Sequence, residues 1–333
     1  MQNTKVTVLG AGSWGTALAN HLSHVGHEVT IWSPELDVLS QIEAEQKNDK
    51  YFPGLILKKM TVERDIERSL AQAQLIVVSV PSFAYREVSE HLKKVKDREA
   101  LIVSTGKGLE EESLSRLTEV IQHELSGYQR VVALSGPSFA LEVLKGLPTA
   151  VVIAAADLEI AKEAATYFHH DYFRVYPSID IIGVEIGGAI KNIIALAVGV
   201  VDGAGMGNNA RAALVTRGLA EIQRLVVAMG GDKLTIVGLS GLGDLLLTST
   251  GDLSRNRRAG LALGQGEKLS DVLTKIGQVV EGVQTAPKAK RLAEKYGVIM
   301  PIVDEMNKLL KGETTAKESI ATLLARAPNV EFR

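Results

Sequence analysis

The sequence feature that most constrains the fold is a glycine-rich turn near the N-terminus. A short apolar run at residues 6–9 leads directly into Gly10-Ala11-Gly12-Ser13-Trp14-Gly15, and a helical pattern follows at residues 16–25. Glycines at this spacing permit a tight turn, a close approach of the backbone to a pyrophosphate, and close packing of the helix on the strand. Strand, turn and helix in this order therefore predict a dinucleotide site, with the phosphates at the helix N-terminus.

The first half of the chain alternates apolar, β-rich runs with helical runs. Strands are expected at residues 6–9, 28–32, 75–80, 101–104, 131–134 and 150–153, and helices at residues 16–25, 83–94 and 113–125. Continuous apolar strands are typical of a parallel sheet covered on both faces. The alternation therefore predicts an α/β fold with a doubly wound, mostly parallel sheet, a dinucleotide-binding Rossmann domain over residues 1–180.

After about residue 180 the pattern changes to long helical runs with glycine-rich joints. Helices are expected at residues 186–201, 210–229, 270–276, 285–295 and 302–310, and no run predicts a strand. Residues 181–333 should therefore form an all-α substrate-binding and catalytic domain, with a cleft where it meets the first domain. The apolar run at residues 186–201 is shorter than a membrane span needs and contains Lys191 and Asn192, so a buried core helix is expected.

Composition excludes several function classes. The net charge of -2 comes from balanced acids and bases, so we expect no nucleic-acid partner and no stable membrane insertion. The chain has no cysteine, which excludes disulfides, thiolate metal sites and cysteine nucleophiles, and permits a cytoplasmic location. The N-terminus has no pattern of a signal peptide.

The second predicted strand bears on the choice of cofactor. Enzymes that use NAD usually place an acid at the end of this strand, where it binds the ribose hydroxyls. Here the strand ends at Trp32, and Ser33-Pro34-Glu35 follows, without an arginine for a 2′-phosphate. Glu35 could reach the ribose or be solvated at a helix start, so both NAD(H) and NADP(H) remain open.

Lys191 is the most informative single residue. It lies in an apolar helical run after Gly187 and Gly188 and beside Asn192, where a buried lysine is costly unless it has a function. The alternative is a lysine whose stem packs on the helix while its amine reaches the surface. We favour a catalytic lysine that exchanges a proton with a hydroxyl or carbonyl oxygen.

Other polar clusters stand at positions suited to an anionic ligand. Lys107 follows the fourth predicted strand between glycines, and the segment 135–140 follows the next, at the sheet edge where α/β folds bind ligands. In the helical half, Arg255 lies in the cluster 254–258, and Asp244 could cap a helix, bind Lys191 or bind a substrate hydroxyl. We interpret two groups as solvated surface: the basic pair Arg257 and Arg258, and the run His169, His170 and Asp171.

Together, these motifs resemble the bacterial NAD(P)-dependent glycerol-3-phosphate dehydrogenase family. The resemblance covers essentially the whole chain. It rests on residues 10–19 (Gly-Ala-Gly-Ser-Trp-Gly-Thr-Ala-Leu-Ala), 107–109 (Lys-Gly-Leu), 135–140 (Ser-Gly-Pro-Ser-Phe-Ala), 190–192 (Ile-Lys-Asn), 241–244 (Gly-Leu-Gly-Asp), 254–258 (Ser-Arg-Asn-Arg-Arg) and 279–282 (Val-Val-Glu-Gly).

The resemblance implies a helical domain like that of 6-phosphogluconate dehydrogenase, a homodimer, and interconversion of dihydroxyacetone phosphate and sn-glycerol 3-phosphate for glycerophospholipid synthesis. It makes Lys191 the catalytic proton carrier, with no metal. It assigns substrate binding to Lys107, Gly136, Ser138, Lys191, Asp244, Ser254, Arg255 and Asn256. Cofactor binding falls to the motif glycines Gly10, Gly12 and Gly15 and, by resemblance, to Ser13, Trp14, Lys107, Ala140, Arg255, Val279 and Glu281.

One departure concerns Pro34, which stands where relatives commonly carry a histidine or arginine suited to a 2′-phosphate. This departure argues against a strict preference for NADP. Two rival interpretations remain. Another reductase of the same fold group, for a hydroxyacid or ketopantoate, would not need Lys107 together with the cluster at residues 254–256; a silent NAD-binding sensor would not need Lys191 in an apolar helix.

Overall fold

The computed structural model describes residues 4–326, with side chains given for all of these except residues 96–98. The chain divides into two compact units, Met1–Glu185 and Ile186–Arg333. The division falls inside the long helix α8 (Ile181–Gly203), just after the boundary at residue 180 expected from the sequence.

The first unit is built on a mostly parallel sheet, as predicted. Its described residues form eight strands in the order β3-β2-β1-β4-β5-β6-β7-β8, and only β6 and β7 pair antiparallel. The bounds are β1 (Lys5–Leu9), β2 (Glu28–Trp32), β3 (Thr61–Val62), β4 (Leu75–Val78), β5 (Leu101–Ser104), β6 (Val131–Ser135), β7 (Thr149–Ala154) and β8 (Phe173–Ser178). The fold-class prediction of a Rossmann-like sheet is confirmed.

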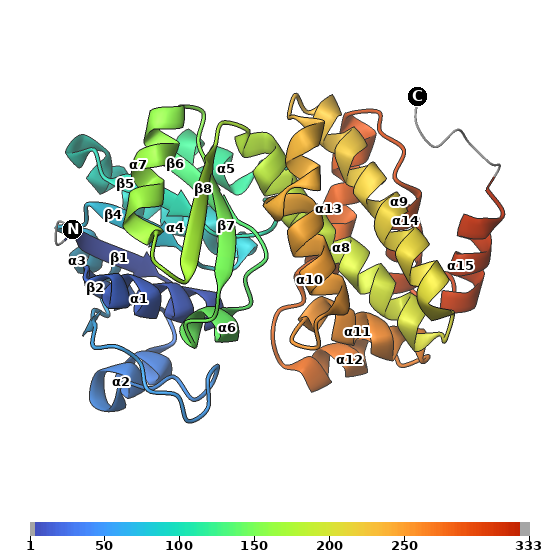
Figure 1. The fold of residues 1–333 in the computed structure, drawn as a ribbon, viewed down its shortest axis with the longest axis horizontal. Helices are drawn as coiled ribbons and strands as arrows, with labels where there is room; N and C mark the ends of the chain where they lie inside the picture. Colours follow the sequence, from blue (N-terminus) through green and yellow to red (C-terminus); the bar gives the residue numbers. More distant parts are fainter. Residues whose placement is uncertain (1–3, 327–333) are drawn as a thin grey trace. The chain divides into compact units, whose positions relative to one another are not determined.

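Helices cover both faces of this sheet (Figure 1). In β4, Leu75 and Val77 belong to one core cluster, while Ile76 and Val78 belong to another on the opposite face. Such a strand is apolar along its whole length because both faces are buried. The helices of this unit are α1 (Ser13–Val25), α2 (Leu36–Glu45), α3 (Ile66–Leu70), α4 (Tyr85–Leu92), α5 (Leu117–Glu124), α6 (Ala140–Leu144) and α7 (Leu158–Phe168).

Helix α5 begins later than the sequence pattern predicts. The pattern predicts a helix from residue 113, but residues 110–115 form a closed turn instead. Glu110 accepts hydrogen bonds from both the backbone nitrogen and the hydroxyl of Ser113, and its own backbone nitrogen donates to Ser115. Leu114 has a φ of 60°, so the helix can start only after it.

The second unit is helical, and no strand occurs among its described residues, as predicted. A 3₁₀ segment, η3 (Lys233–Val237), and a π-helical turn, η4 (Leu239–Gly243), lie between its helices. The helices after α8 are α9 (Gly207–Ala228), α10 (Asp244–Thr250), α11 (Arg255–Gly264), α12 (Leu269–Ile276), α13 (Glu281–Lys295), α14 (Pro301–Leu310) and α15 (Ala316–Leu324).

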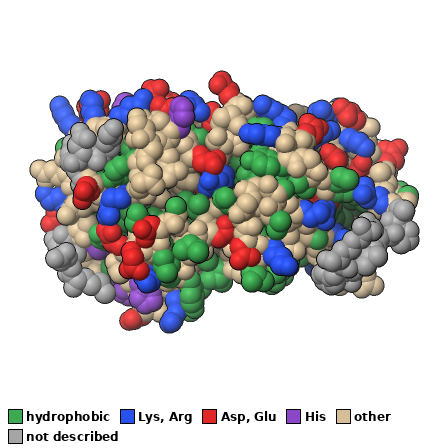
Figure 2. Space-filling view, turned by 90° about the horizontal axis from the view of Figure 1, so that it is seen from above, with side chains coloured by type: hydrophobic (Ala, Val, Ile, Leu, Met, Phe, Trp, Pro, Cys, Tyr) green, Lys and Arg blue, Asp and Glu red, His purple; other side chains and the backbone are tan. Residues whose placement is uncertain are grey.

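Helix α8 is the one described helix long and apolar enough to cross a membrane, and 89% of its apolar window is buried. An apolar helix that is buried to this extent is a core helix, as predicted for this segment. On the face seen in Figure 2, Lys and Arg side chains are interspersed with Asp and Glu side chains. This mixed surface agrees with the balanced composition.

Helices α8 and α11 meet through two pairs of glycines. A Cβ at Gly199 would lie 2.9 Å from the Cα of Gly260, and a Cβ at Gly203 would lie 3.1 Å from the Cα of Gly264. Only hydrogen atoms fit at these four positions, so the two backbones are in direct contact. This contact fixes the position of the N-terminus of α11 relative to α8.

Candidate active site

The glycine turn has the geometry that a pyrophosphate requires. Gly10 has a φ of 113°, and a Cβ there would meet the carbonyl of Ser79, while a Cβ at Gly15 would meet the carbonyl of Gly10. At Gly12 a Cβ would meet nothing within 4 Å, so the backbone there is open to a ligand. The three glycines thus serve the turn, the ligand and the helix–strand packing separately.

The N-terminus of α1 is prepared for an anion. Gly12 is its N-cap, no side chain caps it, and its first turn holds no acid. The indole nitrogen of Trp14 is buried without a hydrogen-bond partner among the described residues. Backbone N–H groups at a helix start favour phosphate, and a buried donor without a partner is costly, so this loop fits a dinucleotide.

Lys107 and Ser138 converge on one carbonyl at the carboxyl edge of the sheet. The Lys107 amine donates to the carbonyl of Gly136 at 3.1 Å, and the Ser138 hydroxyl donates to the same oxygen at 3.1 Å. Lys107 follows β5 and Gly136 follows β6, two adjacent parallel strands. The structure therefore brings these three predicted substrate residues together; Ala140 begins α6 just beyond them.

Tyr85, which the sequence does not single out, holds the loop before Lys107. Its hydroxyl donates to the carbonyl of Val78 at 3.0 Å and accepts from the backbone nitrogen of Gly106 at 2.8 Å. Burial raises the pKa of the Tyr85 hydroxyl, which keeps it protonated as a donor. A tyrosine in a helical run gives no signal of this role in sequence.

The buried Lys191 forms an ion pair with Asp244. The amine of Lys191 lies 2.8 Å from Asp244 Oδ1, and the two side chains are 5% and 2% exposed. The same amine donates to the hydroxyl of Thr248 at 2.6 Å, and that hydroxyl lies 2.6 Å from the carbonyl of Asp244. The alternative of a surface-reaching lysine is wrong, and of the three roles left open for Asp244 the bond to Lys191 is present.

The π-helical turn η4 sets the position of Asp244. A Cβ at Gly241 would collide with the backbone of Ile236, so only glycine allows η3 and η4 to pack this closely. Asp244 begins α10 directly after this turn, and Thr248 lies one helical turn further on the same face. A π-helical turn in this place is consistent with a functional site.

A chain of amide hydrogen bonds joins α8, α11 and α13. The Asn256 amide donates to Asn192 Oδ1 at 3.0 Å, and the backbone nitrogen of Gly282 donates to Asn256 Oδ1 at 2.8 Å. Asn192 is buried beside Lys191. These hydrogen bonds therefore fix α8, which carries Lys191, against α11 and α13. The sequence groups Asn256 with the substrate residues, and the structure also uses its amide for this internal link.

The other predicted residues of the second unit lie around this link. Ser254 caps α11 by accepting from the backbone nitrogen of Arg257 at 3.1 Å, and Arg255 donates to the carbonyl of Val279 at 3.0 Å. Burial raises the pKa of Glu281, while the nearby cations Arg255, Lys288 and Lys191 oppose that rise. Glu281 Oε2 is buried without a hydrogen-bond partner among the described residues, which suits an acceptor for a cofactor N–H or O–H group.

Two surface interpretations need correction. Arg257 is not a solvated turn residue: its side chain is 15% exposed and lies 3.2 Å from Asp202 and 2.9 Å from Asp252, because α11 turns it toward α8. His170 is partly buried, with its ring 5.0 Å from that of His24. Arg258, His169 and Asp171 are exposed as expected. No group of three or more His, Asp or Glu in the described part of the chain is arranged to hold a metal ion.

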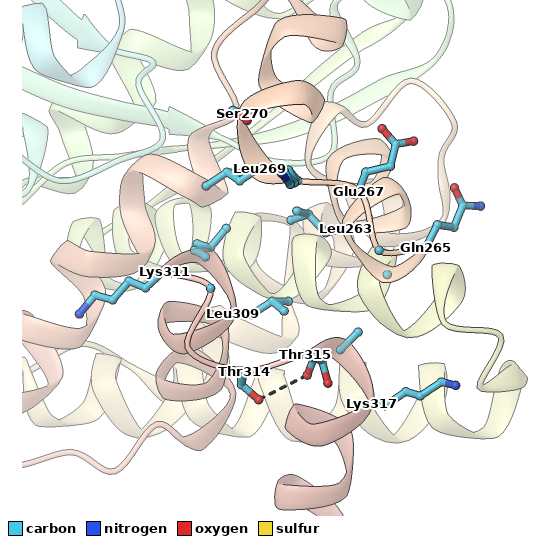
Figure 3. A pocket seen from close by; sticks show the side chains of 16 residues that line it. Leu263, Gln265, Glu267, Leu269, Ser270, Leu309, Lys311, Thr314, Thr315 and Lys317 are labelled. Carbon is cyan, nitrogen blue, oxygen red and sulfur yellow. Dashed lines mark hydrogen bonds between the residues drawn. The ribbon is translucent and has the colours of Figure 1, made fainter.

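A separate cavity of about 710 Å³ lies in the second unit, at the ends of α11 and α14 and the starts of α12 and α15 (Figure 3). None of the predicted site residues lines it. In Figure 3 Leu263 and Leu309 lie on its walls, while the amines of Lys311 and Lys317 extend away from it.

The predicted residues thus fall into two groups, one on each unit. A glycine turn at the carboxyl edge of a parallel sheet, and a buried lysine–carboxylate pair in a helical unit, define a dinucleotide-dependent oxidoreductase. Models of the NAD-dependent glycerol-3-phosphate dehydrogenase N-terminus and C-terminus match residues 5–161 and 180–321. The chain belongs to the NAD-dependent glycerol-3-phosphate dehydrogenase family.

Curated relatives and a solved structure agree with this assignment. The chain is 48% identical to glycerol-3-phosphate dehydrogenase [NAD(P)+] of Moorella thermoacetica over 96% of each chain. It is 44% identical to that of Thermoanaerobacter sp. over 97% of each chain. The crystal structure of glycerol-3-phosphate dehydrogenase from Coxiella burnetii superposes with a TM-score of 0.92 at 41% identity, covering 97% of this chain and 99% of that one. The resemblance inferred from sequence motifs is confirmed.

Proposed function

We propose that this chain catalyses the reversible transfer of hydride between NAD(P)H and dihydroxyacetone phosphate, giving sn-glycerol 3-phosphate. The observation that carries the proposal is the buried pair of Lys191 and Asp244, with an amine-to-carboxylate distance of 2.8 Å. A nicotinamide cofactor supplies the hydride. Reduction of a ketone also needs a proton for the developing alkoxide, and a buried lysine is suited to give it.

The roles of the helical unit follow from its contacts. Asp244 and Thr248 orient the Lys191 amine, and the ammonium stabilises the negative charge that develops on the substrate oxygen. In the oxidative direction the same amine accepts the hydroxyl proton. The guanidinium of Arg255 and the capped start of α11 are suited to the substrate phosphate, because a planar fork and helix N–H groups both bind that anion.

The first unit supplies the groups that hold the cofactor. The open backbone at Gly12 and the unpartnered indole of Trp14 support binding of the dinucleotide at the start of α1. Lys107 and Ser138 are further candidates for the phosphorylated substrate, since both side chains carry donors at the sheet edge. Hydride transfer requires the cofactor and the substrate to be in contact.

The direct test follows the absorbance of the reduced nicotinamide with dihydroxyacetone phosphate as substrate. We expect oxidation of NADH or NADPH that depends on the phosphate, so dihydroxyacetone itself should be a poor substrate. No oxidation with either cofactor would contradict the proposal. Oxidation with a 2-keto acid such as ketopantoate in place of the phosphate would favour the rival reductases.

The proposal extends to a homodimer, to the cytoplasm and to a role in glycerophospholipid synthesis. Exposed apolar side chains on neighbouring elements of the helical unit, Val227, Leu234 and Ile299, support self-association; they are 53%, 65% and 68% exposed. The absence of cysteine agrees with a reducing compartment. Light scattering coupled to gel filtration would test the dimer, and a mass of 35.7 kDa, that of one chain, would contradict it.

A further inference from the structure

Beyond the groups already described, the first unit carries an acid, a lysine and a tyrosine that contact one another. The Glu35 carboxylate forms a salt bridge with the Lys50 amine at 3.0 Å. The Tyr51 hydroxyl donates to the two carboxylate oxygens of Glu35, at 3.2 and 3.3 Å. We call Glu35, Lys50 and Tyr51 the Glu35 cluster. Glu35 is the N-cap residue of α2, but its side chain caps no backbone nitrogen, so the carboxylate is held by the cluster instead.

The Glu35 cluster lies next to the glycine turn. The strand β2 ends at Trp32, whose carbonyl accepts a hydrogen bond from the backbone nitrogen of Gly10 at 2.7 Å. Trp14 and Tyr51 pack against the same hydrophobic core. In Rossmann domains the adenosine ribose is recognised at this end of the second strand. The cluster is therefore placed where one ribose hydroxyl distinguishes NAD(H) from NADP(H).

Two cations at this end of β2 are each paired with a carboxylate. Lys50 is paired with Glu35, and Arg64, whose carbonyl accepts from the Trp32 indole at 3.1 Å, is paired with Glu43 at 2.8 Å. A 2′-phosphate needs cations that are not already matched by carboxylates. A ribose hydroxyl, in contrast, is a donor that a fixed carboxylate accepts.

We propose that Glu35, held in place by Lys50 and Tyr51, accepts a hydrogen bond from the adenosine ribose and makes this chain select NAD(H) over NADP(H). The inference rests on the proposed function only in that it requires a nicotinamide cofactor. Glu35 is the specificity-determining residue, and Lys50 and Tyr51 are positioning residues. Pro34, beside Glu35, has no side-chain donor for a phosphate.

The test measures binding, without substrate. The only two tryptophans of the chain are Trp14 and Trp32, both close to the site, so quenching of their fluorescence reports NADH and NADPH binding. Adenosine 5′-monophosphate and adenosine 2′,5′-bisphosphate, used as competitors, isolate the ribose contact. The variant is Glu35→Gln, which removes the charge and keeps the size. The matched control is Glu45→Gln, because Glu45 is also on α2 and is paired with Lys47 at 3.2 Å.

We expect the wild-type chain to bind NADH about tenfold or more tightly than NADPH, the effect of one charge-assisted hydrogen bond. Glu35→Gln should reduce that ratio to near one, by weakening NADH and by tightening NADPH and adenosine 2′,5′-bisphosphate, and Glu45→Gln should preserve it. Equal or tighter binding of NADPH by the wild-type chain overturns the inference. So does a ratio that stays unchanged in Glu35→Gln, or one that falls equally in Glu45→Gln.

The outcome separates this inference from the proposed function. Selective binding of NADH by a chain that does not reduce dihydroxyacetone phosphate supports the inference and contradicts the proposed function. Reduction of dihydroxyacetone phosphate by a chain that binds NADPH more tightly than NADH supports the proposed function and contradicts the inference. A buffer of higher ionic strength gives a second check: the NADPH affinity of Glu35→Gln should fall with salt, since it depends on the charge of Lys50.

Discussion

The carboxylate of Glu185 forms a buried ion pair with Arg116, and 2.6 Å separates Glu185 Oε2 from Arg116 Nη1. Glu185 also accepts from the backbone nitrogen of Thr118 at 2.9 Å, so it holds the start of α5 against the first turns of α8. Replacing Glu185 with alanine removes the buried partner of Arg116 and leaves the guanidinium with the exposed carboxylate of Glu119. We expect the free energy of unfolding to fall by about 3–5 kcal/mol.

The control for this prediction is Glu119→Ala. Glu119 pairs with the same guanidinium at 2.7 Å, but its side chain is 44% exposed. Water replaces an exposed partner at little cost, so a loss below about 1 kcal/mol is expected. Urea unfolding followed by circular dichroism measures both variants. Equal losses would show that burial of the Glu185 pair is unimportant.

Lys191→Met should abolish most turnover while leaving cofactor binding intact. The methionine keeps the length of the side chain and removes both the proton and the charge, so kcat should fall by about 10² to 10⁴. Because the buried carboxylate of Asp244 then loses its ion-pair partner Lys191, the double variant Lys191→Met/Asp244→Asn should be the more stable of the two. Steady-state kinetics and thermal unfolding measure these effects. Near-native turnover in Lys191→Met would contradict the role of Lys191.

Gly260→Ala should weaken binding of the phosphorylated substrate. It should leave the glycine turn at residues 10–15 unchanged. A Cβ at Gly260 would lie 2.9 Å from the Cα of Gly199, so α8 and α11 would have to move apart. Overpacking of this kind costs about 1–3 kcal/mol of unfolding free energy. Since α11 begins with Arg255, KM for dihydroxyacetone phosphate should rise. The Kd for NADH should rise less, because the glycine turn at residues 10–15 lies in the other unit. An equal loss of both affinities would show that the damage is global.

The buried His21 should make the first unit sensitive to acid. Its ring contacts the Tyr172 hydroxyl at 2.9 Å and the carbonyl of Phe168 at 2.7 Å. Burial chiefly, with repulsion from His170, His24 and His27, lowers its pKa from 6.5 to about 4. Between pH 6.5 and about pH 4, His21 therefore binds a proton in the unfolded chain but not in the native unit. This contribution to stability is complete above pH 6.5 and is lost as the pH falls toward 4, a change of about 3 kcal/mol.

His21→Gln checks that prediction. Glutamine does not titrate in this range, so the unfolding free energy of the variant should depend less on pH between 7 and 4 than that of the wild-type chain. Tryptophan fluorescence reports this unit, because Trp14 and Trp32 both lie in it. Parallel pH profiles for the two proteins would exclude His21 as the source.

The sequence predicts most of the sheet because its central strands are buried on both faces and therefore continuously apolar. Strands β2 and β5 have the predicted bounds. The sequence does not predict strand β8, which is an edge strand. Its residues alternate between buried and exposed and include Pro177, so its hydrophobic pattern is weak. Strand β3, with two residues, is too short for any pattern.

At the candidate site, sequence motifs identify groups but not their contacts. The bond between Lys191 and Asp244 could be proposed because both residues interrupt apolar segments. The contact of Thr248 with Lys191 could not be predicted, because a threonine in a helix gives no sequence signal. Its role depends on packing against a lysine 57 positions earlier. The link from Asn192 to Asn256 also depends on tertiary structure, because it joins two helices 64 positions apart.

The paired glycines of α8 and α11 set the distance between the helix that carries Lys191 and the helix that begins with Arg255 by main-chain dimensions alone. Side chains at such a crossing differ in volume and can change rotamer, whereas two peptide backbones in contact have one closest separation. Repacking of the surrounding apolar side chains therefore leaves the separation of the two helices, and with it the reach from Lys191 to Arg255, unchanged.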